Sequence, residues 1–239
     1  MTVSPARAAA FDILLRVDTQ DAYASELLHS ALLEKLSSRD RGLATEIVMG
    51  VLRWRSRLDE AIAAAASRPL AKLDPEVLTA LRIGAYQLTL LERVPPSAAI
   101  NESVELVKRA RKTSAAPFAN AVLRKLASTS PVSIADQIGA APETIAREYA
   151  HPPWLVERWA KQFDIEKALK ICKQDQLEPA PSLRFEDPSA EAELAAEGIQ
   201  LSPGGMLTSA RRLLDCDASE ICDRKGRCHI IKSRSWVIL

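Results

Sequence analysis

Apolar residues recur at helical spacing through the first 128 residues, and serine, aspartate or proline marks the start of most runs. Ser4 followed by Pro5, and Asp74 followed by Pro75, each pair an N-cap residue with a proline suited to the first helical position. Short polar segments separate the runs. The pattern predicts helices that begin at or near Ser4, Ser25, Ser38, Leu58, Asp74, Ser97 and Pro117.

Each predicted helix has one apolar stripe, which we expect to face a common core. The stripe after Asp74 is the most regular of these. About seven helices joined by short loops are typical of an all-α domain, here over residues 1–128. The residues of the predicted stripes are Ala8, Phe11, Leu15, Leu28, Leu32, Leu36, Leu43, Ile47, Val51, Trp54, Leu58, Ile62, Ala66, Val77, Leu81, Ala85, Leu88, Ile100, Val104, Val107, Phe118, Val122 and Leu126.

The pattern changes after a polar, proline-ended segment, so residues 129–141 are predicted to be a linker. Residues 142–214 then predict a small, incomplete α+β subdomain, and residues 215–239 an irregular, aperiodic tail. Within the subdomain, helices are expected near Glu143–Tyr149, Pro153–Phe163, Glu166–Gln174 and from Ser189 to Gly198, with strands at Ser182–Phe185 and Gly198–Leu201.

Composition narrows the class of protein. No apolar run approaches the roughly 20 residues that cross a bilayer, and Asp12 and Arg16 interrupt the N-terminal apolar stretch. We therefore expect a cytoplasmic protein without a membrane partner. Residues 1–130 carry 18 Lys/Arg against 14 Asp/Glu, whereas residues 131–239 carry 14 against 17. The basic first half is compatible with nucleic acid if its cations share a face.

Cysteine spacing does not predict a metal site. Five residues separate Cys216 from Cys222 and Cys222 from Cys228, whereas structural zinc sites usually have two to four residues between paired cysteines. An aperiodic tail also offers no pocket that would lower a thiol pKa, so none of these cysteines is predicted to be a nucleophile. We expect no metal.

Four segments in unbroken order carry a resemblance to a known family: GVLRWRSRLDEAI from Gly50, LRIGAYQLTLL from Leu81, VPPSAAINESVELVKR from Val94, and FANAVLRKL from Phe118. Over residues 5–128 the chain resembles the NusB-like RNA-binding fold, in the version found at the N-terminus of RsmB-type 16S rRNA cytosine-C5 methyltransferases. HPPWLVERW from His151, with PSLRFED and AAEGIQL, is similar to the short RNA-binding subdomain that follows in that family.

The resemblance implies a function. In the family, a further catalytic domain binds S-adenosylmethionine and supplies a cysteine nucleophile, but the likeness here stops at Leu214. A truncated or frameshifted reading frame is therefore the hypothesis, and this chain is predicted to bind RNA, 16S rRNA in particular, without catalysis or cofactor. The Pro-Gly-Gly turn within Ser202–Met206 is interpreted as an ordinary turn. The alternative is a NusB-type antitermination module that regulates transcription with a protein partner.

Candidate RNA-binding residues are mostly cations of the helical domain. Lys108, Arg109 and Lys112 fall within about 100° on one predicted helix, although cations at a helix end also complement its dipole. Phe118 is expected to be core, because it shares a stripe with Val122. The full set of candidates is Arg7, Arg53, Arg55, Lys108, Arg109, Lys112, Asn120 and Arg124.

Overall fold

The computed structural model describes residues 3–30, 33, 35–128, 141–177, 182–185, 188–204, 207–213 and 228–231. Its contacts divide the chain into two compact units, residues 1–172 and 173–239. The division falls inside a helix, α11, rather than in the predicted linker, most of which lies outside the described ranges. The domain boundaries expected from sequence therefore stay a prediction.

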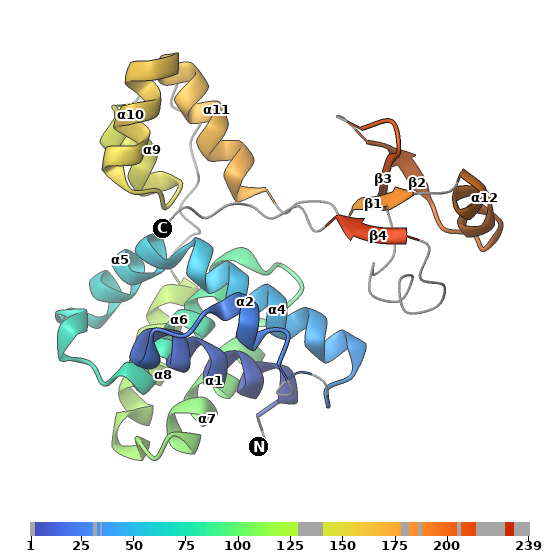
Figure 1. The fold of residues 1–239 in the computed structure, drawn as a ribbon. Helices are drawn as coiled ribbons and strands as arrows, with labels where there is room; N and C mark the ends of the chain where they lie inside the picture. The colour runs from blue at the N-terminus through green and yellow to red at the C-terminus, as the bar shows by residue number, and fades with distance from the viewer. Residues whose placement is uncertain are drawn as a thin grey trace. The chain divides into compact units, whose positions relative to one another are not determined.

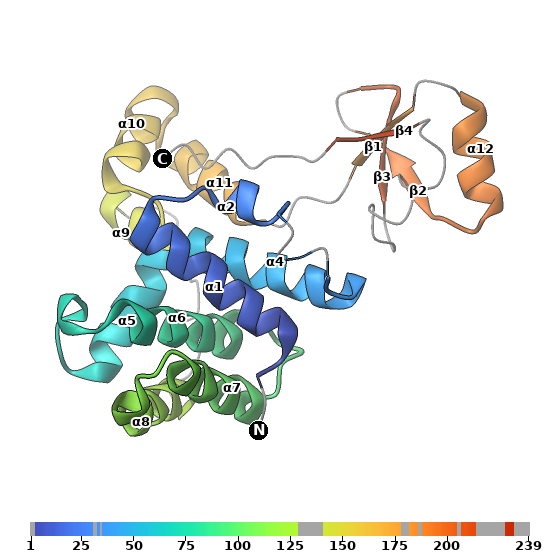
Figure 2. The same cartoon turned by 60° about the horizontal axis from the view of Figure 1, so that its bottom comes forward.

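The first unit is helical (Figures 1 and 2). Its first part packs α1 against α4 and α6, and α6 against α5, α7 and α8. The elements of this part are α1 (Pro5–Gln20), α2 (Ala24–Leu27), α4 (Ser38–Arg53), α5 (Arg55–Ala66), the 3₁₀ turn η1 (Leu70–Lys72), α6 (Pro75–Leu90), α7 (Pro96–Arg109), the 3₁₀ turn η2 (Thr113–Ala115) and α8 (Ala116–Ser128).

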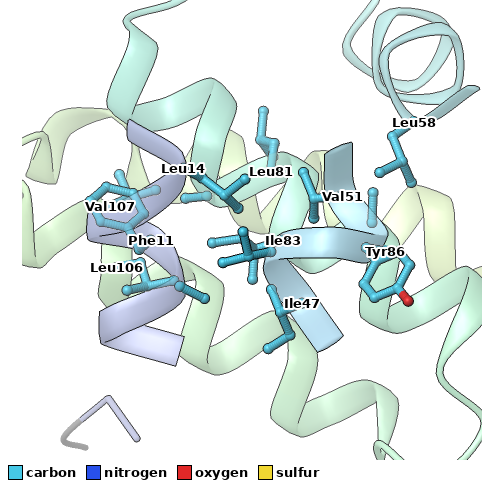
Figure 3. Packing of buried hydrophobic residues seen from close by; sticks show 14 of the residues in the cluster. Phe11, Leu14, Ile47, Val51, Leu58, Leu81, Ile83, Tyr86, Leu106 and Val107 are labelled. Carbon is cyan, nitrogen blue, oxygen red and sulfur yellow. The ribbon is translucent and has the colours of Figure 1, made fainter. Parts of the chain in front are cut away.

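α6 is the central helix of this part. Residues 81–87 are all buried, so neighbours cover it on every side, whereas the sequence predicts one apolar stripe. Leu81 and Ile83 lie among apolar side chains of α1 and α4 (Figure 3). Because helices surround α6, its polar residues Arg82 and Gln87 are also buried and need partners inside the protein.

Several helix ends differ from those predicted. Ser37, not Ser38, caps α4, because its hydroxyl accepts a hydrogen bond from the Asp40 amide at 3.2 Å. The helix expected to begin near Leu58 begins three residues earlier, at Arg55, and Trp54 separates it from α4. Ser97 is expected to cap the next helix, but α7 already begins at Pro96, since proline suits the first helical position.

Three further helices complete the first unit: α9 (Pro142–Glu148), α10 (Pro153–Phe163) and α11 (Ile165–Gln176). They match the helices predicted there and share a small core of their own around Tyr149, Val156 and Cys172. α9 contacts α5, where Arg57 Nη1 donates a 2.6 Å hydrogen bond to the carbonyl of Glu148. That bond satisfies a carbonyl at the C-terminal end of α9.

The second unit is a small antiparallel sheet with a helix. Its strands lie in the order β2-β3-β1-β4, from β2 (Leu201–Pro203), β3 (Ala210–Leu213), β1 (Ser182–Phe185) and β4 (Cys228–Ile231). The helix α12 (Pro188–Ala196) ends before Gly198, whose φ of 83° is left-handed as predicted for a C-terminal glycine. No element is predicted in the tail, yet β4 pairs there with β1, from Cys228 opposite Phe185.

Within the described residues, no helix is both long and apolar enough to cross a membrane.

Candidate nucleic-acid interface

One segment of the helical part is rich in cations and holds no carboxylate. Residues 106–135 contain no Asp or Glu. The described portion of the segment covers the end of α7, the turn η2 and all of α8. Sequence reasoning on single helices missed this run, although counting charges along the chain would have found it. Its cations are Lys108, Arg109, Arg111, Lys112, Arg124 and Lys125.

The three cations predicted to share a helix face are separated in the structure. α7 ends at Arg109, and Arg111 adopts a left-handed φ of 61°, so Lys112 lies beyond the helix. Arg109 forms an ion pair with Asp12 of α1 at 2.7 Å, whereas Lys112 pairs with Asp74 at the start of α6 at 3.0 Å. The expectation that all three lie on one helix is therefore wrong.

Carboxylates hold each of these three cations. The hydrogen bond to Asp12 raises the pKa of Arg109, and the hydrogen bond to Asp74 raises the pKa of Lys112. Lys108 pairs with Glu105 at 2.7 Å and lowers the pKa of that carboxyl group. A phosphate would have to compete with these carboxylates for the same N–H donors.

Arg53, Arg55 and Arg57 lie close to Trp54 in the sequence, where α4 ends and α5 begins. Arg55 pairs with Asp18 of α1 at 2.8 Å. The Arg57 guanidinium lies 5.9 Å from the centroid of the Trp54 ring, and its Nη1 donates a hydrogen bond to the Glu148 carbonyl of α9. These two contacts within the protein fix the orientation of the Arg57 side chain. Arg53 is half-buried and forms no ion pair with any residue that the structure describes.

Arg7 lies inside the helical domain. Its side chain is 9% exposed, and its guanidinium donates to Gln87 Oε1 at 2.6 Å and to Glu102 Oε1 at 3.1 Å. Ser4 Oγ accepts a further bond at 3.0 Å. These bonds join α1 to α6 and α7, which is a structural role. Arg7 therefore presents no free guanidinium to a phosphate.

The α5–α8 surface carries the remaining candidates. Arg124 is exposed, and its Nε donates to Asn120 Oδ1 at 3.3 Å. Phe118 is half-buried rather than fully in the core, and the guanidinium of Arg68 lies 4.5 Å from its ring centroid. Arg68 follows α5 and was not predicted, because its aromatic partner is fifty residues along the chain.

Lys125 joins the same two helices. Its Nζ donates to the carbonyl oxygens of Ala64 and Ala65 at 3.4 and 3.2 Å, at the end of α5. Cations favour the C-terminal end of a helix, where carbonyl groups lack partners. Lys125 thus fixes α8 against α5 and supports the position of Arg68 and Phe118. We call Arg68, Phe118, Asn120 and Arg124 the α5–α8 basic surface. It consists of two pairs, Arg68 with Phe118 and Arg124 with Asn120, and helical spacing separates the second pair from Phe118 by about 120–160° around α8.

The Pro-Gly-Gly turn does not fit S-adenosylmethionine in its described part. The turn follows β2 and leads to the antiparallel strand β3, whereas a cofactor loop of this kind joins a parallel strand to a helix. The Gly204 amide donates to Ala210 O at 2.9 Å, and a Cβ at Gly204 would lie 2.8 Å from that of Ala210. The glycine serves close packing within the sheet.

Among the described side chains, no three or more His, Cys, Asp or Glu residues are grouped so that they could hold a metal ion. Cys216 and Cys222 lie outside the described residues, and the side chain of Cys228 is also outside them.

The amino-acid sequence is similar to those of curated proteins. It is 34% identical over 220 residues to the probable ribosomal RNA small subunit methyltransferase B of Bacillus subtilis strain 168, covering 90% of this chain and 49% of that protein. The chain thus spans about half the length of this relative.

Two solved structures are similar in fold. The crystal structure of PH0851 matches with a TM-score of 0.65 at 12% identity, covering 96% of this chain and 53% of that one. A chain in the crystal structure of a plectonemic RNA supercoil matches with a TM-score of 0.50 at 25% identity, covering 54% and 96% respectively. The NusB family model matches residues 4–128, and the chain therefore belongs to the NusB family.

Proposed function

We propose that this chain is the RNA-recognising portion of a 16S rRNA cytosine-C5 methyltransferase. One observation carries the proposal: similarity to a ribosomal RNA small subunit methyltransferase B extends over 220 residues, well past the NusB match that ends at residue 128. The same continuation favours a methyltransferase over an antitermination module, because a NusB protein alone would account only for the helical part.

The α5–α8 basic surface is the part of the helical domain that we assign to RNA. Its cations contact an aromatic ring and an amide rather than carboxylates. A guanidinium stacked on a ring keeps N–H donors at its edge for phosphate, and its open face suits a base. α8 itself contains no Asp or Glu to oppose a polyanion.

The other candidate cations rank below this surface. Lys108, Arg109 and Lys112 each have a carboxylate partner, so phosphate binding there would first break an ion pair. Arg53 has no carboxylate partner among the residues described and stays a secondary candidate. Few phosphate contacts imply an affinity in the micromolar range, with a marked dependence on salt.

A titration against 16S rRNA fragments at several salt concentrations tests the proposal. Fluorescence anisotropy of the wild-type chain should report binding, and the Arg68→Ala, Arg124→Ala double variant should weaken it. Arg16→Ala is the matched control, because Arg16 is an exposed arginine on α1 whose Nε donates a hydrogen bond to Gln20 Oε1 at 3.3 Å, away from α5 and α8. Binding no stronger than that of a charge-matched unrelated protein at low salt would overturn the RNA role.

Methyl transfer is expected to require more than this chain. Because the described part of the Pro-Gly-Gly turn does not fit S-adenosylmethionine, we propose that the chain holds no cofactor of its own. Incubation with unmodified 16S rRNA and S-adenosylmethionine labelled in its methyl group should give no incorporation. Incorporation above a no-protein blank would contradict a noncatalytic chain.

A further inference from the structure

Trp154, on the outer face of α10, is exposed and does not pack into the small core that α9, α10 and α11 share. Val156 is buried between α9 and α11, and Trp159 and Ala160 pack on the same small core. Trp154 instead lies on the opposite side with 56% of its surface exposed. Its indole offers a flat, exposed ring on which another ring can stack.

Trp154 lines an open groove of about 440 Å³. The groove is open to solvent rather than enclosed, so it offers a surface for one stacked ring and not a pocket that would surround a small molecule. The described residues that line it with Trp154 all come from α10: Glu157, Arg158, Lys161 and Gln162.

Helical spacing places the cations beside the ring. Arg158 and Lys161 follow Trp154 by four and seven residues, so the three side chains lie along one face of the helix. Neither cation forms an ion pair with a residue in the described ranges. They differ in this from Lys108, Arg109 and Lys112, whose charges are already matched by carboxylates.

We propose that this face of α10 binds single-stranded RNA, with one nucleobase stacked on the indole of Trp154 and the flanking phosphates at Arg158 and Lys161. Aromatic stacking joined to cations is how proteins hold single strands, and it tolerates any base. The inference rests on the proposed RNA-binding function and adds a second contact, outside the NusB-family residues 4–128.

The chemistry of the groove favours RNA over an apolar protein partner. Trp154 is the sole apolar residue among the described ones that line it. The groove also holds three charged groups, Glu157, Arg158 and Lys161, and a hydrophobic surface docked there would remove all three from water without offering any of them a polar partner, which is costly. A nucleotide instead supplies both a flat ring and an anion.

The test uses the whole chain and a fluorescein-labelled oligouridylate, which has no stable secondary structure. Trp154→Ala should weaken binding about tenfold, which corresponds to one stacked base, and Trp154→Phe should restore most of the affinity. Arg158→Ala with Lys161→Ala should lower the slope of log affinity against log salt by about 1.4, at about 0.7 for each single-strand phosphate contact.

Two control variants match the changes. Tyr23→Ala removes an aromatic ring that is 70% exposed on the other part of the unit, and Lys170→Ala removes an exposed cation of α11. Both should bind oligouridylate as the wild type does. Thermal unfolding of all variants should be unchanged, because the substituted side chains are exposed.

The outcomes separate this inference from the proposed function. If the wild type binds 16S rRNA fragments but Trp154→Ala binds oligouridylate as well as the wild type does, the α10 site is wrong and the RNA role stands. Binding to no RNA at all would overturn both. Self-association of the wild type that Trp154→Ala abolishes, without an effect on RNA affinity, would assign the face to a second copy of the chain and overturn the inference.

Discussion

Arg82 and Asp59 form a two-point ion pair between α6 and α5. Arg82 Nε lies 2.6 Å from Asp59 Oδ1, and Nη2 lies 2.7 Å from Oδ2. Arg82 Nη1 also donates to Asp18 of α1 at 2.7 Å. Because Arg82 is 6% exposed, this network fixes three helices through one buried guanidinium.

Replacement of Arg82 by alanine should lower the free energy of unfolding by about 3–5 kcal/mol, since two carboxylates would lose their buried partner. Urea denaturation followed by circular dichroism measures the loss. Arg109→Ala is the control, because its pair with Asp12 is largely exposed and should be worth under about 1 kcal/mol. Equal losses for the two variants would show that burial does not decide the contribution.

Gly84 permits close contact of α6 with α7 and α8. A Cβ there would lie 2.7 Å from a methyl group of Leu123 and 2.8 Å from Ser103 Oγ. Gly84→Ala should therefore cost about 1–3 kcal/mol of unfolding free energy through overpacking. Thermal unfolding measures this as a lowered Tm.

Gly42 is the matched control for that substitution. It lies within α4, and nothing is within 4 Å of a Cβ built on it. Gly42→Ala should raise stability by about 0.5–1 kcal/mol, because alanine loses less backbone entropy in a helix. A loss of stability at position 42 would contradict the exposed helical placement.

Asp164 joins α10 to α11, and its pH dependence can be predicted. Its side chain accepts hydrogen bonds from Lys167 and also pairs with the Lys167 ammonium group, which lowers its pKa. A lowered folded-state pKa contributes stability above the ordinary aspartate value of about 3.9, and this contribution is lost as the pH falls through the lowered pKa.

The difference in unfolding free energy between wild type and Asp164→Ala should therefore be full at neutral pH and shrink in acid. Asp164→Asn separates the contribution of the hydrogen bond to the Lys167 amide from that of the ion pair with the Lys167 ammonium group. The amide oxygen of asparagine can still accept the hydrogen bond at the start of α11, but it carries no charge. We expect Asp164→Asn to keep part of the stability and to lose the acid dependence. A difference between wild type and Asp164→Ala that grows in acid would contradict the direction of the pKa change.

Salt dependence distinguishes positioning arginines from RNA-contacting ones. Arg124→Ala should reduce the slope of log affinity against log salt for structured 16S fragments by about 0.9, the value for one duplex phosphate contact. Arg109→Ala should change the slope less, because Asp12 neutralises that cation in the free protein. Anisotropy titrations across a salt series measure both slopes. A larger reduction of the slope for Arg109→Ala than for Arg124→Ala would place the RNA interface on α7 rather than on α8.

Most helices were predictable because their signals are local. Pro75, Pro96 and Pro153 each stand at a helix start. The apolar periodicity gave part of the buried faces, namely Ile47 and Val51 of α4 and Val122 and Leu126 of α8, and missed small or neighbouring residues such as Ala44 and Leu123. Strand β4 was not predictable, because four residues gain stability only by pairing with β1, more than forty residues earlier. The sequence could not distinguish Ser37 from Ser38 as the N-cap of α4, because the two adjacent serines have the same capping propensity.

The sequence by itself determined the helical class, the succession of helices and the membership of the NusB family. It also supplied the candidate cations, but not which of them are available to a ligand. Arg7 meets Gln87 eighty residues away, and Arg109 meets Asp12 ninety-seven residues away. Ion pairs form wherever the packed helices bring charges together, so only the tertiary structure decided that Arg7 is structural and that Arg68, Arg124 and the Trp154 face stay accessible.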